Sequence, residues 1–174
     1  PVMKTTKQFF TLPSPTMPSV LSASSTPSHL LRSQRPEDPH HTVSIDYGQR
    51  HRVELEFAQQ LSTLAGVATH RQIQVDLRSI GGSPLTDPDL AVPAAVEDRQ
   101  TATVVPFRNL LFVTLAAGVA EVENVHDLYI APVRDDQAAY RDCRREFYDS
   151  LESTLGLGAT QEADFRIHTP LVEY

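Results

Sequence analysis

Two polar segments of the chain hold residues suited to binding an anion. The segment Asp46–His51 stands where a predicted strand gives way to a predicted helix, and its Arg50 and His51 add positive charge to the helix start. Arg108 and Asn109 open a strongly apolar helix, where an arginine needs a carboxylate or a bound phosphate or carboxyl group as its partner. Taken alone, each segment also fits a structural role, as a solvated helix turn and as an ion pair respectively.

A third segment, Arg134–Phe147, is the densest polar cluster that follows a predicted strand. Its carboxylates, among them Asp142, and its Tyr140 are suited to a planar ligand with several hydrogen-bonding groups. Cys143 lies near a predicted helix start beside Arg144, a setting that favours the thiolate. The alternative interpretation is a charged surface helix with a half-buried cysteine.

Nucleophile–base pairs and metal-ligand spacings are not visible in the sequence. The seven histidines form no ligand-spaced pair beyond His40-His41, which lies in the proline-rich segment described below. We therefore predict no metal site from the residues themselves.

The elements that must position these residues alternate between strand and helix from His41 onward. The pattern of apolar residues predicts strands over 42–47, 72–77, 127–131 and 165–169. It predicts helices over 50–65 (closed by Gly66), over 108–122, and from an Asp142 N-cap to Leu155. Strands separated by such helices imply right-handed βαβ units, and therefore an α/β fold with a doubly wound, Rossmann-like parallel sheet.

Polar residues follow each predicted strand, and in parallel sheets ligands bind at the edge where the carboxyl ends of the strands lie. We expect these residues to meet at that edge: 47–51, Asp76 with the loop 78–103, 134–136 and 168–170. The loop 78–103 is long for a compact domain, which is typical of a functional or disordered segment.

Residues 1–41 differ in composition from the rest of the chain. They contain seven of the thirteen prolines, many serines and no glycine. Proline at this density interrupts helices and sheet ladders, so we predict a disordered segment before a partial α/β domain over 42–174.

Composition excludes several classes of partner. The net charge of −7 argues against nucleic acid and anionic membranes, and no apolar run approaches a membrane span. With one cysteine and no signal-peptide pattern, the sequence predicts a cytoplasmic protein.

Taken together, the motifs resemble 7-cyano-7-deazaguanine synthases, in order and in spacing. The motifs are Asp46–His51 with Glu54-Leu-Glu56, Leu85-Thr86, Val105–Asn109, Tyr140–Arg144 with Glu146-Phe147, and Ile167–Leu171. The resemblance covers residues 43 to 172. It implies an adenine nucleotide alpha-hydrolase-like fold of the ATP pyrophosphatase type, with a five-stranded parallel sheet, and a homodimer.

The resemblance also implies an activity. Such enzymes convert 7-carboxy-7-deazaguanine and ammonia to the 7-cyano compound of queuosine biosynthesis, using ATP with Mg, through an acyl adenylate and an amide. It implies that Tyr47, Gln49, Arg50 and His51 line the nucleotide side and that Arg108 and Asn109 act near the phosphates or the activated carboxyl. Tyr140, Asp142, Cys143 and Arg144 are expected at the deazaguanine pocket or the dimer contact.

The chain departs from this family at both ends. The slot of the Ser-Gly-Gly-x-Asp-Ser loop that wraps ATP contains no glycine, and the four cysteines of the zinc site are absent. The residues in this place, 4–41, have about the length of the family's first strand, loop and helix but a different composition. This combination favours a frame-shifted reading of the normal coding sequence over divergence. We expect the chain as written not to bind ATP tightly or turn over, and its sheet to lack the central first strand.

Two alternatives stay open at this point. One is a non-catalytic homologue that binds a deazaguanine or a partner subunit. The other is a different ATP pyrophosphatase, such as a glutamine-dependent amide-forming synthetase, against which the Asp-Cys-Arg and His-Thr-Pro-Leu segments count.

Overall fold

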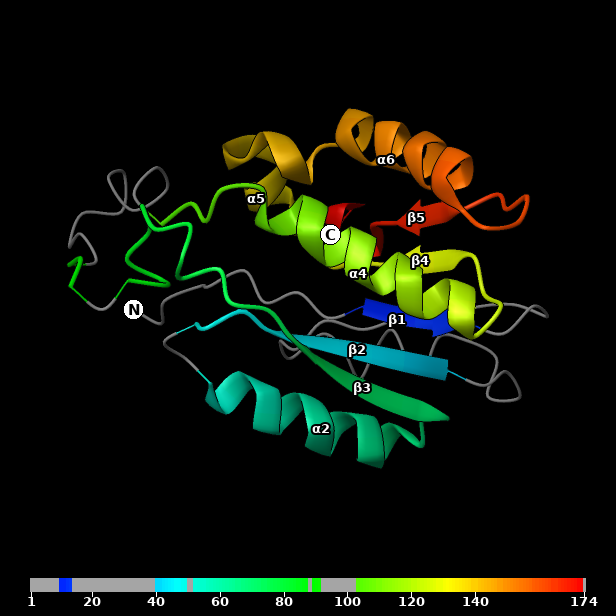
Figure 1. Cartoon of the computed structure of the whole chain (residues 1–174), viewed down its shortest axis with the longest axis horizontal. Helices are drawn as coiled ribbons and strands as arrows, with labels where there is room; N and C mark the ends of the chain where they lie inside the picture. Colours follow the sequence, from blue (N-terminus) through cyan, green and yellow to red (C-terminus); the bar gives the residue numbers. More distant parts are fainter. Residues whose placement is uncertain (1–9, 14–39, 50–51, 88, 92–102, 174) are drawn as a thin grey trace.

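A five-stranded sheet forms the centre of the fold (Figure 1). Its strands lie in the order β3 (Thr69–Gln74), β2 (His40–Asp46), β1 (Phe10–Pro13), β4 (Asp127–Tyr129) and β5 (Arg166–His168). The structure is a computed structural model that describes residues 10–13, 40–49, 52–87, 89–91 and 103–173.

The strands form two parallel pairs joined by an antiparallel strand. Strand β2 runs parallel to β3, with His41 opposite Thr69 and Asp46 opposite Gln74, and β4 runs parallel to β5. Strand β1 lies between the pairs and is antiparallel to both β2 and β4. The expected parallel strand direction is therefore confirmed for both outer pairs and wrong at the centre. The expectation of a missing central strand is also wrong, because β1 comes from the segment predicted to be disordered.

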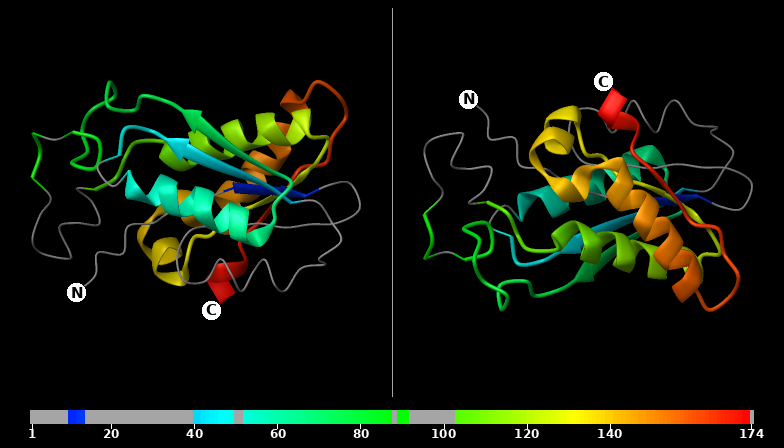
Figure 2. Two further views of the ribbon diagram at one scale, coloured as in Figure 1. Left: turned by 90° about the horizontal axis from the view of Figure 1, so that it is seen from below. Right: turned by 90° about the horizontal axis from the view of Figure 1, so that it is seen from above.

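Helices cover both faces of the sheet. Helix α2 (Val53–Ala65) lies on one face, and α4 (Arg108–Val122) and α6 (Arg145–Gly158) lie on the other (Figures 1 and 2). The shorter elements are α5 (Arg134–Ala139), η1 (Arg141–Cys143) and η2 (Pro170–Glu173). Within the described residues, the helices are too short or too polar to span a membrane.

The main hydrophobic core lies between the sheet and the helix pair α4 and α6. Val43, Leu128 and Ile167 of three strands are at most 1 % exposed and pack in one cluster with Val113 of α4 and Leu151 of α6. Burial of such side chains contributes roughly 1.5–3 kcal/mol each, so this cluster is the principal source of stability.

Helix α2 presents an unexpected face to the sheet. Of the four apolar residues whose spacing predicted this helix, Val53, Phe57 and Leu64 are more than half exposed, and only Leu61 is partly buried, against Ala58. The buried side chains are Leu55, Ala58 and Ser62. The reason lies in β2, whose side chains toward α2 are the polar Thr42 and Ser44, so that a small polar residue packs there better than a large apolar one.

Several element boundaries differ from those predicted. Helix α4 begins and ends where expected, and Gly66 closes α2 in a left-handed conformation. Strand β3 lies three residues earlier than predicted, and α5 was not predicted. Asp142 is not a helix N-cap, because it lies within η1 and α6 begins only at Arg145.

Candidate functional site

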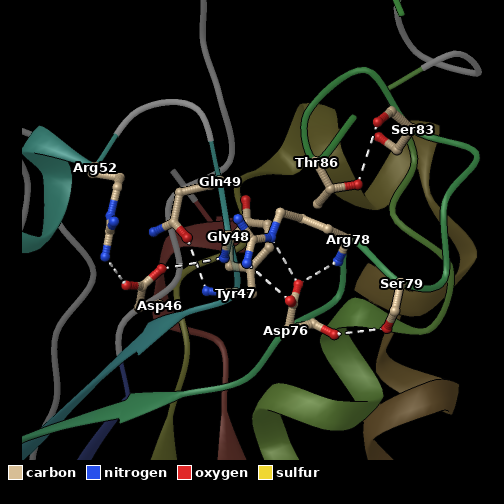
Figure 3. Close-up of polar contacts among 10 residues, drawn as sticks. All are labelled: Asp46, Tyr47, Gly48, Gln49, Arg52, Asp76, Arg78, Ser79, Ser83 and Thr86. Atoms are coloured by element: carbon tan, nitrogen blue, oxygen red, sulfur yellow. Dashed lines mark hydrogen bonds and ion pairs between the residues drawn. The ribbon is translucent and has the colours of Figure 1, made fainter. Parts of the chain in front are cut away.

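The turn after β2 is fixed by hydrogen bonds between its side chains and its own backbone (Figure 3). The buried Asp46 carboxylate accepts a bond from the Gly48 N–H at 3.2 Å and pairs with Arg52. The Gln49 side-chain oxygen accepts a bond from the Tyr47 N–H at 2.9 Å. These bonds hold Tyr47 and Gln49 at the carboxyl end of β2, where both were predicted.

Arg78 lies across this turn and was missed by the sequence analysis. Its guanidinium donates two bonds to Asp76, at 2.8 and 2.9 Å, and Figure 3 shows the side chain beside Gly48. A Cβ on Gly48 would come within 2.9 Å of the Arg78 side chain, and Gly48 has a φ of +83°. Glycine is therefore favoured there by the backbone conformation, while the exposed Arg78 side chain is flexible enough to give way. The only sequence signal for Arg78 is its place directly after a predicted strand.

Arg108 connects the turn after β2 with α4. Its positive charge acts on the Tyr47 hydroxyl. Burial raises the pKa of Tyr47, and Arg108 opposes that rise. The Tyr47 ring packs against Phe112, with the ring centroids 5.2 Å apart.

Arg108 also reaches the electrostatic environment of η1. Burial raises the pKa of the Asp142 carboxyl, and the Arg108 charge opposes this effect. The charge of Arg108 thus influences both Tyr47 and Asp142, which belong to two other predicted segments.

Asn109 and Cys143 form a buried contact between α4 and η1. The Asn109 amide nitrogen donates to the Asp142 carbonyl at 3.3 Å and to the Cys143 sulfur at 3.4 Å. Both side chains are 2 % exposed. Burial raises the pKa of Cys143 to about 12, so the expected thiolate is wrong: the sulfur is a buried, protonated thiol.

The other predicted site residues lie further out or outside the described residues. Tyr140 ends α5, and its N–H donates to the Asp136 carbonyl at 2.8 Å. Arg144 is exposed and donates to the Gln137 carbonyl at 3.3 Å. Arg50 and His51 lie outside the described residues.

The last strand places His168 in a different contact. Its ring nitrogen lies 2.6 Å from the Asp127 carboxylate, and the ring stacks on Tyr129 at a centroid distance of 4.2 Å. Burial raises the pKa of Tyr129 to about 12, with a further rise from Asp127.

The loop after β3 contains a compact turn around its Leu85-Thr86 motif. Ser83 and Thr86 are buried, and the Thr86 hydroxyl donates to the Ser83 carbonyl at 3.3 Å. The Leu85 N–H donates to the Ser83 hydroxyl oxygen at the same distance. This part of the predicted loop is therefore ordered by its own small polar side chains, and residues 92–102 lie outside the described part.

The residues present do not fit the zinc site that the resemblance implies. That site needs four cysteines, and the chain has one, which is buried and protonated. In the ranges that the structure describes, no three His, Cys, Asp or Glu side chains are grouped so as to hold a metal ion.

The alternation of parallel strands and helices, with polar residues meeting beyond the carboxyl end of β2, defines an α/β protein of the adenine nucleotide alpha-hydrolase fold. The family described as queuosine biosynthesis protein QueC matches residues 24–174. The chain belongs to this family. The match begins before residue 42 and so includes part of the segment set apart on composition.

Curated relatives agree with this assignment. A 7-cyano-7-deazaguanine synthase of Saccharophagus degradans is 43 % identical over 136 residues, which cover 76 % of this chain and 60 % of the relative. The corresponding protein of Pseudomonas aeruginosa is 41 % identical over 134 residues, covering 75 % and 60 %. That of Erythrobacter litoralis is 42 % identical over 136 residues, covering 75 % and 56 %. The aligned region thus spans about three-fifths of these relatives.

Proposed function

We propose that the chain is a partial 7-cyano-7-deazaguanine synthase whose residues bind the deazaguanine substrate, 7-carboxy-7-deazaguanine. The observation that carries this proposal is that three family segments meet at α4: Asn109 beside Arg108 donates to the Asp142 carbonyl, and Tyr47 packs against Phe112 of the same helix. The names of the curated relatives support the substrate class.

The ligand groups match the side chains in charge and hydrogen bonding. A guanidinium such as Arg108 pairs well with a carboxylate, and a carboxyl group such as Asp142 accepts bonds from the N–H groups of a guanine-like ring. In this proposal Tyr140 and Arg144 border the deazaguanine site and Tyr47 and Gln49 line the nucleotide side, to which the resemblance alone assigns Arg50 and His51.

In the reaction proposed for the complete site, ATP converts the substrate carboxylate to an acyl adenylate and releases pyrophosphate. Ammonia then displaces AMP to give an amide, and a second ATP drives dehydration to the nitrile. In this scheme Arg108 stabilises negative charge on the carboxylate and on the oxyanion formed when ammonia attacks. Mg enters as the counter-ion of ATP.

The chain as written is proposed to bind ATP weakly and not to turn over. The family's pyrophosphate loop needs glycines for close backbone approach, and the first glycine of this sequence is Gly48. This observation favours a second candidate function, that of a non-catalytic homologue that binds a deazaguanine or a partner subunit. A homodimer, as the resemblance implies, fits either candidate.

The test is calorimetric titration of the 174-residue chain with 7-carboxy-7-deazaguanine and, separately, with Mg-ATP. We expect binding of the first, a loss of about tenfold in affinity or more in Arg108→Gln, and no loss in Arg166→Gln, whose side chain is exposed and pairs with Asp164. Absence of deazaguanine binding contradicts the proposed function. Micromolar Mg-ATP affinity, or AMP release when Mg-ATP, 7-carboxy-7-deazaguanine and ammonia are combined, contradicts the proposed inactivity.

A further inference from the structure

We propose that Asn109 is a positioning residue, which locks η1 against α4 so that Asp142 and Arg108 face the same ligand. Asn109 is the second residue of α4 and is 2 % exposed. Its contacts are to neighbours 33 and 34 residues later in the chain, at the end of the turn that carries Asp142. The role of Asn109 in substrate binding rests on the proposed function, whereas its role in holding the turn does not.

The amide of Asn109 uses both of its ends. Its nitrogen donates to the Asp142 carbonyl and the Cys143 sulfur, and its oxygen accepts from Arg108 Nε at 3.5 Å. The reversed amide would set its oxygen against the Asp142 carbonyl oxygen and its N–H groups against the guanidinium, so only this orientation satisfies both sides. Aspartate lacks the donor, and leucine has the volume without either bond.

The turn held by Asn109 has a deeply buried part and a part that lies nearer the surface. Cys143 and the fully buried Tyr148 lie in the interior, while the Asp142 carboxyl is less deeply buried. Because Asn109 bonds the backbone of Asp142 and the side chain of Arg108, loss of the amide releases the carboxyl and the guanidinium together.

Cys143 gives a readout of this lock that needs no ligand. It is the only cysteine of the chain and is 2 % exposed, so alkylation by iodoacetamide reports opening of the turn. We expect Asn109→Leu to raise the alkylation rate by roughly tenfold or more, because the hydrogen bonds to the Asp142 carbonyl and the Cys143 sulfur are both lost. Val113→Ala, a core change in α4, calibrates the increase that global destabilisation alone produces. Asn124→Gly at the other end of α4 is the neutral control, because glycine adopts the positive φ of that position without added charge.

The second readout is the affinity for 7-carboxy-7-deazaguanine and for 7-deazaguanine, which lacks the carboxylate. Arg108→Gln weakens only the carboxylated ligand, whereas Asn109→Leu and Asn109→Asp weaken both by roughly tenfold. If Asn109→Leu alkylates no faster than Val113→Ala at equal stability, the lock is wrong. If it weakens only the carboxylated ligand, Asn109 acts on Arg108 alone. If the unaltered chain binds neither ligand, the proposed function is wrong. The alkylation rates still test whether Asn109 holds η1 against α4.

Discussion

A buried polar cluster between α2 and the sheet shows how single residues set the properties of this protein. The Thr42 hydroxyl lies 2.9 Å from the Ser62 hydroxyl and 2.7 Å from His70 Nδ1, which is also 3.1 Å from Ser62. His70 Nε2 is buried and has no hydrogen-bond partner among the described residues. A neutral imidazole fits this site, and burial lowers the pKa of His70.

This pKa shift makes the folded protein sensitive to acid. Because the folded pKa of His70 lies below 6.5, the unfolded chain binds the proton more readily, and stability falls as the pH drops below about 6.5. Between pH 7.5 and 5.5, the free energy of unfolding measured with urea should change less with pH in His70→Gln than in the unaltered chain. The two slopes should differ by less than about 1.4 kcal/mol per pH unit, which is the limit for one proton. Thr63→Ala is the control, since Thr63 lies on the exposed side of α2 and its replacement removes no titratable group. An unchanged slope in His70→Gln would contradict this prediction.

A second prediction at this scale concerns Phe107, the N-cap of α4. Its φ is +54°, a conformation that bulky L-residues adopt at a cost, and its side chain is 74 % exposed. Phe107→Asn should raise the free energy of unfolding by about 1 kcal/mol, because asparagine tolerates this conformation and little burial is lost. Phe107→Val should lower it. Urea unfolding checks both, and a loss of stability in Phe107→Asn would show that the ring makes a stabilising contact.

At the scale of elements, α6 completes the outer edge of β5. The outward-facing N–H of Ile167 donates to Glu152 at 2.7 Å, and the Ile167 carbonyl accepts from Arg145 at 2.5 Å. Arg145 and Glu152 also pair with each other. Together these two side chains supply the hydrogen bonds that a neighbouring strand would make, which closes this edge.

Glu152→Ala should therefore cost about 2 kcal/mol of unfolding free energy, because it leaves the buried Ile167 N–H without its acceptor and removes one of the two carboxylates that pair with Arg145. Asp149→Ala is the matched control: Asp149 bonds the same Arg145 from a side chain that is 61 % exposed, and its loss should cost less than about 0.5 kcal/mol. Equal costs in urea unfolding would mean that the edge contact adds nothing beyond a surface ion pair.

The elements also show what the sequence can and cannot predict. Helix α4 was predictable to the residue, because it is apolar on most of its surface and follows a proline. The buried face of α2 was not, because it is chosen by Thr42 and Ser44, far away in the chain. Tyr47 could be placed at the carboxyl edge of the sheet from the alternation of strands and helices, whereas Arg108 and Asp142 were assigned to the site through the family resemblance. The burial that keeps Cys143 protonated depends on α4 and α6, and Arg78 depends on its fit to Gly48, so neither followed from local pattern.

At the scale of the whole molecule, a four-residue strand joins the two halves of the sheet. Strand β1 pairs with four residues of β2 and, at Thr11, with Tyr129 of β4. Without β1, strands β2 and β4 would each have backbone N–H and C=O groups left unpaired in the interior of the sheet.

Removal of residues 1–13 should abolish cooperative unfolding, whereas removal of residues 1–9, which precede β1, should leave it nearly unchanged. Circular dichroism during urea unfolding measures both chains. If the shorter chain unfolds at the same urea concentration and with the same slope, the central strand contributes little to stability.

The two outer edges of the sheet differ in a way that sets how copies of the molecule can associate. The β5 edge is closed by Arg145 and Glu152, while within the described residues no strand pairs with the outer side of β3. A sheet can extend through many molecules only if each molecule has two unpaired edge strands, because each must pair with one molecule on either side. With a single open edge, strand-to-strand growth terminates at a symmetric pair and does not continue into a fibre.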